Sequence, residues 1–411
     1  MCSSPESDAA RRAQRHGAPG GRQRGFSLVE LMVGATIGLL VIGAVSTMLT
    51  RNEGLRRAMA ASVDLTTGSG HLAYHLDRSL RSAGSGFVQT WNASLGCALH
   101  AARGPTTLLP SPTPFPAPFG NVPQTVRLLP VLAHGGAGAG GSDVLALAAG
   151  HSGRAETPFR ALPAAIGPSG VRLPTTLSLR GGDLLMLAEP GRHCLIQQVA
   201  AGFVGGTSQD LPLGGDYAPE SVTGPFGIVA RADYNLDAPA WVLPIGRAPN
   251  SAPVLRLYAV GTDRTLYSLD LLRTDGTAAP VPLESGVLEL RARYGLDTDA
   301  TPGIDTWVGP DDPGFTAAEL TDGSAQAAAR LETIVAIRVG LILRDTQVER
   351  TAVAPPTLVL FPDLPTAQRV TRAVSEADRT MRHRTLELTV PLRNVLARNA
   401  QLDAPPAGWA P

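Results

Sequence analysis

The most constraining feature of the sequence is a run of twenty uncharged residues from Leu31 to Thr50, which Arg51 ends. A helix needs about 20 apolar residues to cross a bilayer. An arginine-rich segment comes before the run and contains Arg11, Arg12, Arg15, Arg22 and Arg24 against Glu6 and Asp8. Positive charge favours the cytoplasmic side of a membrane span. The sequence therefore predicts a transmembrane helix over 26–50, with residues 1–25 in the cytoplasm.

The candidate cleavage site lies on the unusual side of this run. A secretory signal is cut after its apolar segment, whereas here a small residue, Gly25, lies just before it. The segment from Gly25 to Glu30 resembles the class III signal of type IV prepilins, which has a basic leader, a glycine, an aromatic residue and a glutamate five residues into the mature chain. The resemblance implies that prepilin peptidase removes residues 1–25 and that Phe26 is N-methylated. The leader is longer than many in that family, which leaves the start codon open.

Glu30 needs a physical explanation, because a carboxylate inside an apolar helix costs about a few kcal/mol and usually has a partner. The resemblance implies that Glu30 of one subunit pairs with the Phe26 amine of its neighbour in a filament. An unpaired buried charge is strongly destabilising, so such a pair would set the register of the subunits. The alternative is a carboxylate that reaches the membrane interface near a helix end. Gly34 and Gly38 form a Gly-x-x-x-Gly step, which allows close helix packing.

The helical pattern continues beyond the apolar run. Apolar residues recur every four positions at Leu55, Met59 and Val63 and again at Leu72, Leu76 and Leu80. Glycines at 84 and 86 supply a stop signal. We therefore expect residues 51–83 to form an amphipathic continuation of the helix.

Residues 84–404 have a different character, with short apolar runs between turns that contain Gly or Pro. Candidate strands are Asp143–Ala148, Leu184–Ala188, Cys194–Val199, Val254–Val260, Leu266–Leu271, Val287–Tyr294, Ile334–Leu343 and Leu386–Pro391. We expect loops over 105–123 and 211–231, a short helix over 317–330, and a tail over 405–411. The predicted fold class is α+β and pilin-like: a long N-terminal helix followed by a large antiparallel β-rich head.

The chain has three cysteines, and removal of the leader leaves Cys97 and Cys194. In a chain that leaves the cytoplasm, such a pair can form a disulfide. Two unrelated buried thiols are the alternative, because spacing alone does not show proximity.

Four segments resemble minor pilins of the PilW type. They are 72–84 with Gly96-Cys97, the Gly-x-Asp strand starts at 141–145 and 181–185, the segment 287–299, and 335–344 with 384–394. The resemblance implies a filament subunit that initiates or caps type IV pilus assembly, with roles in twitching motility, adhesion or DNA uptake. It also implies a single-pass inner-membrane protein with a periplasmic head that later joins the pilus. The implied partners are prepilin peptidase, other minor pilins, the major pilin and the inner-membrane assembly platform.

Few residues suggest further chemistry. Asp297, Asp299 and Asp305 offer oxygen ligands in a glycine-containing loop that would suit calcium, with a plain acidic turn as the alternative; no other cofactor is expected. The formal net charge is zero, which gives no sign of direct nucleic-acid binding. The sequence has no Gly-x-Ser-x-Gly elbow, P-loop or complete metal-site spacing, so we do not expect an enzyme.

Two other functions remain open at this point. A minor pseudopilin of a type II secretion system would use the same signal and Glu30. A pilus-tip adhesin would use the head as a binding module, with the loops over 105–123 and 211–231 as its contact surface.

Overall fold

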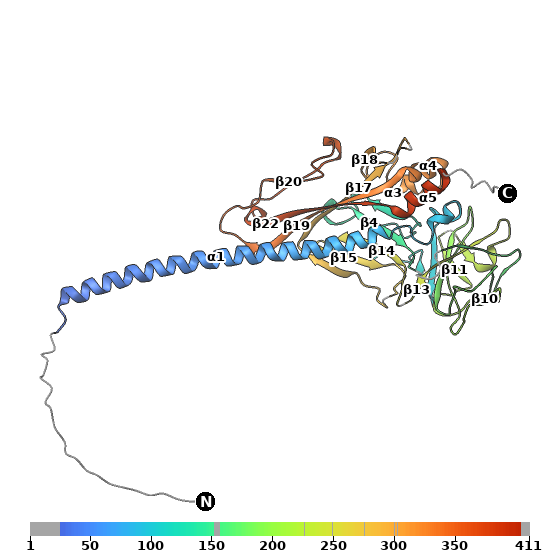
Figure 1. Cartoon of the computed structure of the whole chain (residues 1–411), viewed down its shortest axis with the longest axis horizontal. Coiled ribbons are helices and arrows are strands. Elements are labelled where there is room, and N and C mark those ends of the chain that lie inside the picture. The colour runs from blue at the N-terminus through green and yellow to red at the C-terminus, as the bar shows by residue number, and fades with distance from the viewer. Residues whose placement is uncertain are drawn as a thin grey trace, which may run out of the picture. The chain divides into compact units, whose positions relative to one another are not determined.

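The computed structural model describes residues 25–151, 157–225, 227–248, 250–274, 276–299, 301 and 303–403. The predicted leader, apart from Gly25, and the predicted tail over 405–411 lie outside these residues. The chain divides into a first unit that ends at Ala58 and a second unit that begins at Met59. The long helix α1, Leu28–Arg81, contributes to both units (Figure 1).

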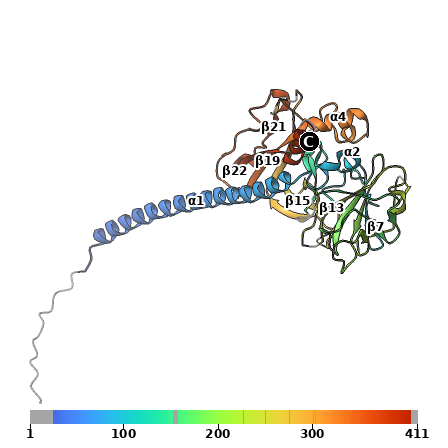
Figure 2. The ribbon, with the colours of Figure 1, turned by 45° about the vertical axis from the view of Figure 1, so that its right-hand side comes forward.

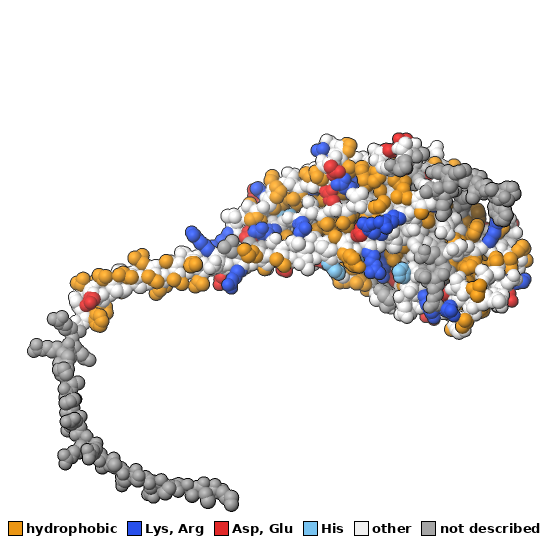
Figure 3. All heavy atoms as spheres, viewed as in Figure 1, with side chains coloured by type: hydrophobic (Ala, Val, Ile, Leu, Met, Phe, Trp, Pro, Cys, Tyr) orange, Lys and Arg blue, Asp and Glu red, His pale blue; other side chains and the backbone are white. Residues whose placement is uncertain are grey.

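The first unit contains the apolar part of α1. The segment Leu28–Glu53 is long and apolar enough to cross a membrane, by length and composition. At 1.5 Å per residue, its 26 residues extend about 39 Å, more than the roughly 30 Å of a hydrocarbon core. Its hydrophobic side chains are exposed (Figure 3).

The second unit is a head with three main sheets (Figures 1 and 2). The five-stranded antiparallel sheet has the order β16 (Val281–Ser285), β15 (Thr265–Asp270), β14 (Val254–Val260), β4 (Val144–Ala149) and β3 (Val131–His134). The four-stranded antiparallel sheet has the order β18 (Thr306–Val308), β17 (Val287–Leu296), β19 (Ile334–Val348) and β22 (Met381–Pro391). The six-stranded sheet has the order β2 (Thr106–Leu109), β1 (Leu99–Arg103), β9 (Cys194–Gln198), β8 (Asp183–Ala188), β13 (Trp241–Arg247) and β5 (Phe159–Arg160).

Smaller elements complete the head. Three small sheets consist of β10 (Asp210–Pro212) with β7 (Gly170–Arg172) and β6 (Ile166–Gly167), β11 (Ser221–Gly224) with β12 (Gly227–Ala230), and β20 (Thr357–Leu360) with β21 (Val370–Ala373). The short α-helices are α2 (Trp91–Ser94), α3 (Ala317–Leu320), α4 (Ala325–Thr333) and α5 (Arg393–Asp403). Single 3₁₀ turns lie at Val88–Thr90, Ala139–Gly141, Arg231–Asp233, Thr366–Gln368 and Asp378–Thr380.

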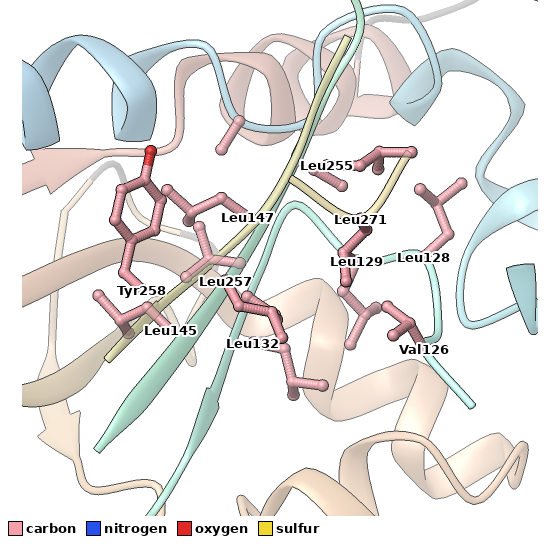
Figure 4. Packing of buried hydrophobic residues seen from close by; sticks show 14 of the residues in the cluster. Val126, Leu128, Leu129, Leu132, Leu145, Leu147, Leu255, Leu257, Tyr258 and Leu271 are labelled. Atoms are coloured by element: carbon pink, nitrogen blue, oxygen red, sulfur yellow. The ribbon is translucent and has the colours of Figure 1, made fainter. Parts of the chain in front are cut away.

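The main core forms where the second part of α1 meets the sheets. Leu72, Leu76 and Leu80 recur at helical spacing and are almost completely buried. They belong to the same core as Leu145 and Leu147 of β4, which pack beside Leu255, Leu257 and Tyr258 of β14 (Figure 4). The hydroxyl of Tyr258 donates a hydrogen bond to Ser79 Oγ over 3.3 Å. The buried leucines and this hydrogen bond together fix the second part of α1 to the head.

Close backbone approach also helps to dock this helix. A Cβ on Gly68 would lie 2.7 Å from Glu284 Oε1, so a larger residue would displace the carboxylate. Nearby, Arg384 Nη1 of β22 donates to Thr66 Oγ1 over 2.8 Å. At the end of the helix, Asn394 Nδ2 donates to the carbonyl of Ala83 over 2.8 Å.

The predicted α+β class is confirmed, and each of the eight candidate strands coincides with a strand of the structure. The predicted loop over 211–231 is wrong. It contains the end of β10 and the hairpin β11–β12, which forms because Val222 and Val229 are buried while their neighbours face solvent. The loop over 105–123 likewise contains β2.

The predicted helix over 317–330 is two helices. The chain turns at Gly323, whose φ of +80° suits glycine. Ser324 then caps α4 by accepting a hydrogen bond from the backbone N–H of Ala327 over 3.0 Å. The helix α5 is not among the elements predicted from the sequence.

We predict that Leu76→Ala lowers the free energy of unfolding of the head by about 2–5 kcal/mol, because it removes a fully buried leucine from the docked face of α1. Tyr74→Ala is the matched control on the same helix, because Tyr74 is 64% exposed; its effect should stay within about 0.5 kcal/mol. Urea unfolding followed by circular dichroism measures both. Equal losses in the two variants would contradict the docking described here.

Candidate functional site

The N-terminal segment places its predicted functional residues around the start of α1. Gly25 and Phe26 precede the helix, and Phe26 is 82% exposed. The carbonyl of Ser27 accepts a hydrogen bond from the N–H of Leu31 over 3.1 Å and so begins the helical ladder. Glu30 lies in the first turn, where a negative charge is favourable near the positive end of the helix dipole. A cut after Gly25 would leave a free amine two residues before the helix.

Glu30 is the acidic residue at the start of the membrane-spanning candidate segment, and its side chain is exposed. Water or a polar headgroup can solvate this carboxylate while the subunit is free. Within a bundle of apolar helices, a compensating positive charge would have to come from another molecule or from a chain end. A role for Glu30 in contact between subunits stays a prediction.

Gly34 and Gly38 lie four residues apart and therefore share one face of α1. A Cβ built on either glycine meets no described atom within 4 Å. Packing inside the described chain does not require a glycine at these positions, although each glycine costs about 1 kcal/mol relative to alanine in a helix. This is the arrangement expected if a second helix packs closely against this face.

The structure joins Cys97 and Cys194 in a disulfide, with their Cα atoms 5.6 Å apart. Cys194 begins β9, which pairs in parallel with β1 so that Leu99 lies opposite Cys194. The bond links residues 97 positions apart. It therefore fastens the segment that follows α1 to the centre of the six-stranded sheet.

Asp297, Asp299 and Asp305 lie together, with one carboxylate oxygen of each within 4.8 Å of the others. Asp305 Oδ2 accepts hydrogen bonds from the N–H and hydroxyl of Thr298, at 2.6 and 2.9 Å. Asp299 Oδ1 accepts from the hydroxyl and N–H of Thr301, and these hydrogen bonds lower the pKa of Asp299. Two of the three carboxylates thus already stabilise their own loop. A calcium site here stays a prediction.

Two known protein families match parts of this chain. The family described as type IV pilus-assembly protein W, PilW, matches residues 253–394. The prokaryotic N-terminal methylation motif matches residues 20–46. The chain is a PilW-like, type IV prepilin-like protein. No curated protein and no solved structure matches it.

The two matches cover different parts of the PilW-like chain. The methylation motif includes Gly25, Phe26, Glu30 and the Gly34–Gly38 step. The PilW match begins just before β14 and ends just after β22, so it includes the four-stranded sheet. Both families are pilus components and neither is an enzyme family. Residues 47–252, which contain all six strands of the six-stranded sheet, lie between the two matches.

A buried ion-pair network, which no local sequence pattern predicts, joins the five-stranded and four-stranded sheets. Asp143, at the start of β4, accepts a hydrogen bond from the N–H of Ala292 over 2.8 Å and pairs with Arg291 of β17 over 3.3 Å. Burial raises the pKa of Asp143. Glu289 pairs with Arg291 over 2.7 Å and with Arg372 over 3.0 Å. Asp143 lies in one of the two Gly-x-Asp segments, but the sequence does not show which of the two becomes buried.

We predict that Gly25→Leu blocks removal of the leader, because signal peptidases of this kind require a small residue at the cut. Intact-mass spectrometry of membrane fractions should find only the uncut chain. Gly34→Leu, inside the apolar segment, is the matched control and should be cut normally. A Gly25→Leu chain that starts at Phe26 would refute the assigned site.

We also predict that replacing both Cys97 and Cys194 with serine destabilises the head by up to about 4–5 kcal/mol, the loop-entropy value for a bond that closes a loop of this length. Urea unfolding under oxidising conditions measures the loss. Wild-type protein treated with a reductant should show the same lowered midpoint. Identical midpoints for the oxidised wild type and the double variant would show that the bond does not stabilise the head.

Proposed function

We propose that this PilW-like protein is a minor pilin that initiates or caps assembly of a type IV pilus. The observation that carries the proposal is an exposed apolar helix, with one carboxylate in its first turn, that continues into a head with the PilW match. The protein belongs among type IV pilus-related pilins. The role at the start or the cap of the filament is our inference.

The physical argument begins with the apolar part of α1. Its side chains are exposed over Leu28–Glu53, so this surface needs lipid or other apolar helices around it. In a prepilin, lipid covers this apolar surface first, and the helices of neighbouring subunits cover it later. Glu30 would restrict how neighbouring helices pack around it, because its charge would be buried among them and would require a cation.

The Phe26 amine is the cation that we assign to this role. Removal of residues 1–25 would create it four residues before Glu30, and N-methylation would leave its positive charge in place. Because both groups would come from the same part of neighbouring chains, only one axial offset between subunits would pair them. The proposed partners are therefore prepilin peptidase, which would create the amine, and the major and minor pilins, which would supply the facing helices.

We place the head in the periplasm and the helix in the inner membrane before assembly, with the assembly platform as the site of extraction. The arginines before the apolar run support this orientation. After assembly the head would lie on the pilus at the cell surface. A type II secretion pseudopilin would share the helix and Glu30, and loss of surface pili rather than of protein export in a deletion strain distinguishes the two.

An adhesin role has one observation in its favour. Residues 47–252 lie outside both family matches, and within them the sheets β10–β7–β6 and β11–β12 share a second buried core with the six-stranded sheet. A separately built surface of this kind could contact a ligand at the pilus tip. Purified full-length protein that binds no surface or glycan would exclude this second role.

We predict that Glu30→Ala leaves membrane insertion and cleavage intact but reduces incorporation into filaments at least about tenfold, the effect of losing one charge pairing of about 1.4 kcal/mol. Quantitative immunoblots of sheared pili and membranes measure the ratio. Glu53→Ala, at the other end of the same apolar segment, is the matched control. Normal incorporation of the Glu30 variant would show that the carboxylate does not set subunit register.

The same fractions identify the mature chain. We expect a mass that starts at Phe26 and carries one added methyl group, and we expect it in the sheared filaments. The same mass confined to membranes would favour a pseudopilin. A mass that retains residues 1–25 in both fractions would contradict the proposed function.

A further inference from the structure

A small pocket with two tryptophan walls lies on the head, where α2, β13 and α5 come together. Its volume is about 260 Å³, and its lining includes Trp91, Trp241, Arg398, Asn92 and Gln89. The helix α2 and the strand β13 are labelled in Figure 2, and α5 in Figure 1. All five residues lie outside both family matches. The pocket is therefore a feature of this chain that the family does not assign.

The tryptophans give the pocket its apolar surface. The whole chain has four tryptophans, and two of them meet here. Trp91 begins α2 and is 8% exposed, whereas Trp241 begins β13 and is partly buried. Flat aromatic faces accept the C–H faces of a ring-shaped ligand, and a few polar groups then fix its orientation.

An arginine lies over each of these rings. Arg398 Cζ is 4.1 Å from the centroid of the Trp91 ring, and Arg160 Cζ is 5.6 Å from that of Trp241. Arg398 also pairs with Glu332, whose carboxylate is 2.9 Å from Nη2. Arg398 lines the pocket, and Arg160 stacks on a wall residue without lining the pocket itself. Their two positive charges exceed the single charge of Glu332, which favours a ligand with negative charge.

Two donors of the pocket walls have no hydrogen-bond partner within the described part of the chain. They are Nη1 of Arg398, whose side chain is 10% exposed, and Nε1 of Trp91. A buried donor without an acceptor costs about 1–3 kcal/mol, more for a charged group. The exposed amides of Gln89 and Asn92 lie at the same pocket. Both nitrogen atoms are themselves buried, so an acceptor oxygen in the pocket would satisfy Arg398 Nη1 only after a small shift of that side chain.

We propose that this pocket binds one acidic sugar residue, a hexuronate. The sugar ring packs on Trp241, its carboxylate accepts from the Arg398 guanidinium, and its hydroxyls bond to the amides of Asn92 and Gln89. The volume suits a single ring, and the aromatic walls with amide groups at the opening suit hydroxyls better than a bare phosphate. The site requires neither cleavage of the leader nor filament assembly, so it stands or falls separately from the proposed minor-pilin function.

The test uses full-length protein in detergent micelles, with methyl glucuronoside as the probe and methyl glucoside as its neutral match. Saturation-transfer NMR should show binding of the glucuronoside at millimolar concentration or below and little binding of the glucoside. Arg398→Gln should weaken the affinity about tenfold, as expected for loss of a hydrogen bond from a charged donor. Arg393→Gln, an exposed position on the same helix, is the matched control and should bind normally.

A second variant guards against misfolding, because Arg398 also stacks on Trp91. Asn92→Ala changes an exposed residue, so the fold should persist by circular dichroism while the affinity falls severalfold. Absence of glucuronoside binding to the wild type would overturn the proposal. Equal binding of the two glycosides, or equal affinities in all variants, would overturn it as well.

Discussion

The docking of the second part of α1 onto the head is the interaction on which the rest of the structure depends. Leu72, Leu76 and Leu80 belong to the same buried core as β4 and β14, and strands of both the five-stranded and the four-stranded sheet contribute to that core. The buried pairing of Asp143 with Arg291 then fixes how the two sheets meet. Apolar burial thus supplies the stabilisation, and the ion pair supplies the geometry.

The first part of the same helix, in contrast, is not packed against the described chain. There the apolar side chains find no partners within the described chain, and Gly34 and Gly38 leave open space beside the backbone. A soluble protein would not tolerate such a surface, so its stability depends on what surrounds it. This explains why one helix can be structural at one end and available for assembly at the other. Glu30 adds selectivity to the apolar end, because burial penalises its charge unless a specific partner is present.

The sequence predicted the features that depend on local pattern. Helical spacing revealed α1, and short apolar or alternating segments bounded by turn residues revealed β4, β8, β9, β14, β15, β17, β19 and β22. Strands of two to four residues, such as β6 and β11, are too short to show an alternation, which is why the hairpin β11–β12 was taken for a loop. The signal around Gly25 and Glu30 was readable because its residues are contiguous. The Cys97–Cys194 pairing was left open, because it depends on a parallel pairing of β1 with β9 across 97 positions.

The tryptophan pocket could not be predicted from local sequence pattern either. Trp91, Pro190, Trp241 and Arg398 come from four separate segments, and none of them has a local motif. Two long-range contacts bring them together: β8 pairs with β13, and Asn394 at the start of α5 bonds to the end of α1. The disulfide between Cys97 and Cys194 lies close to α2 in sequence and joins that segment to β9, the neighbour of β8. The same restraints that stabilise the head therefore also hold the walls of the pocket in place, so a ligand could bind there at little cost in ordering side chains.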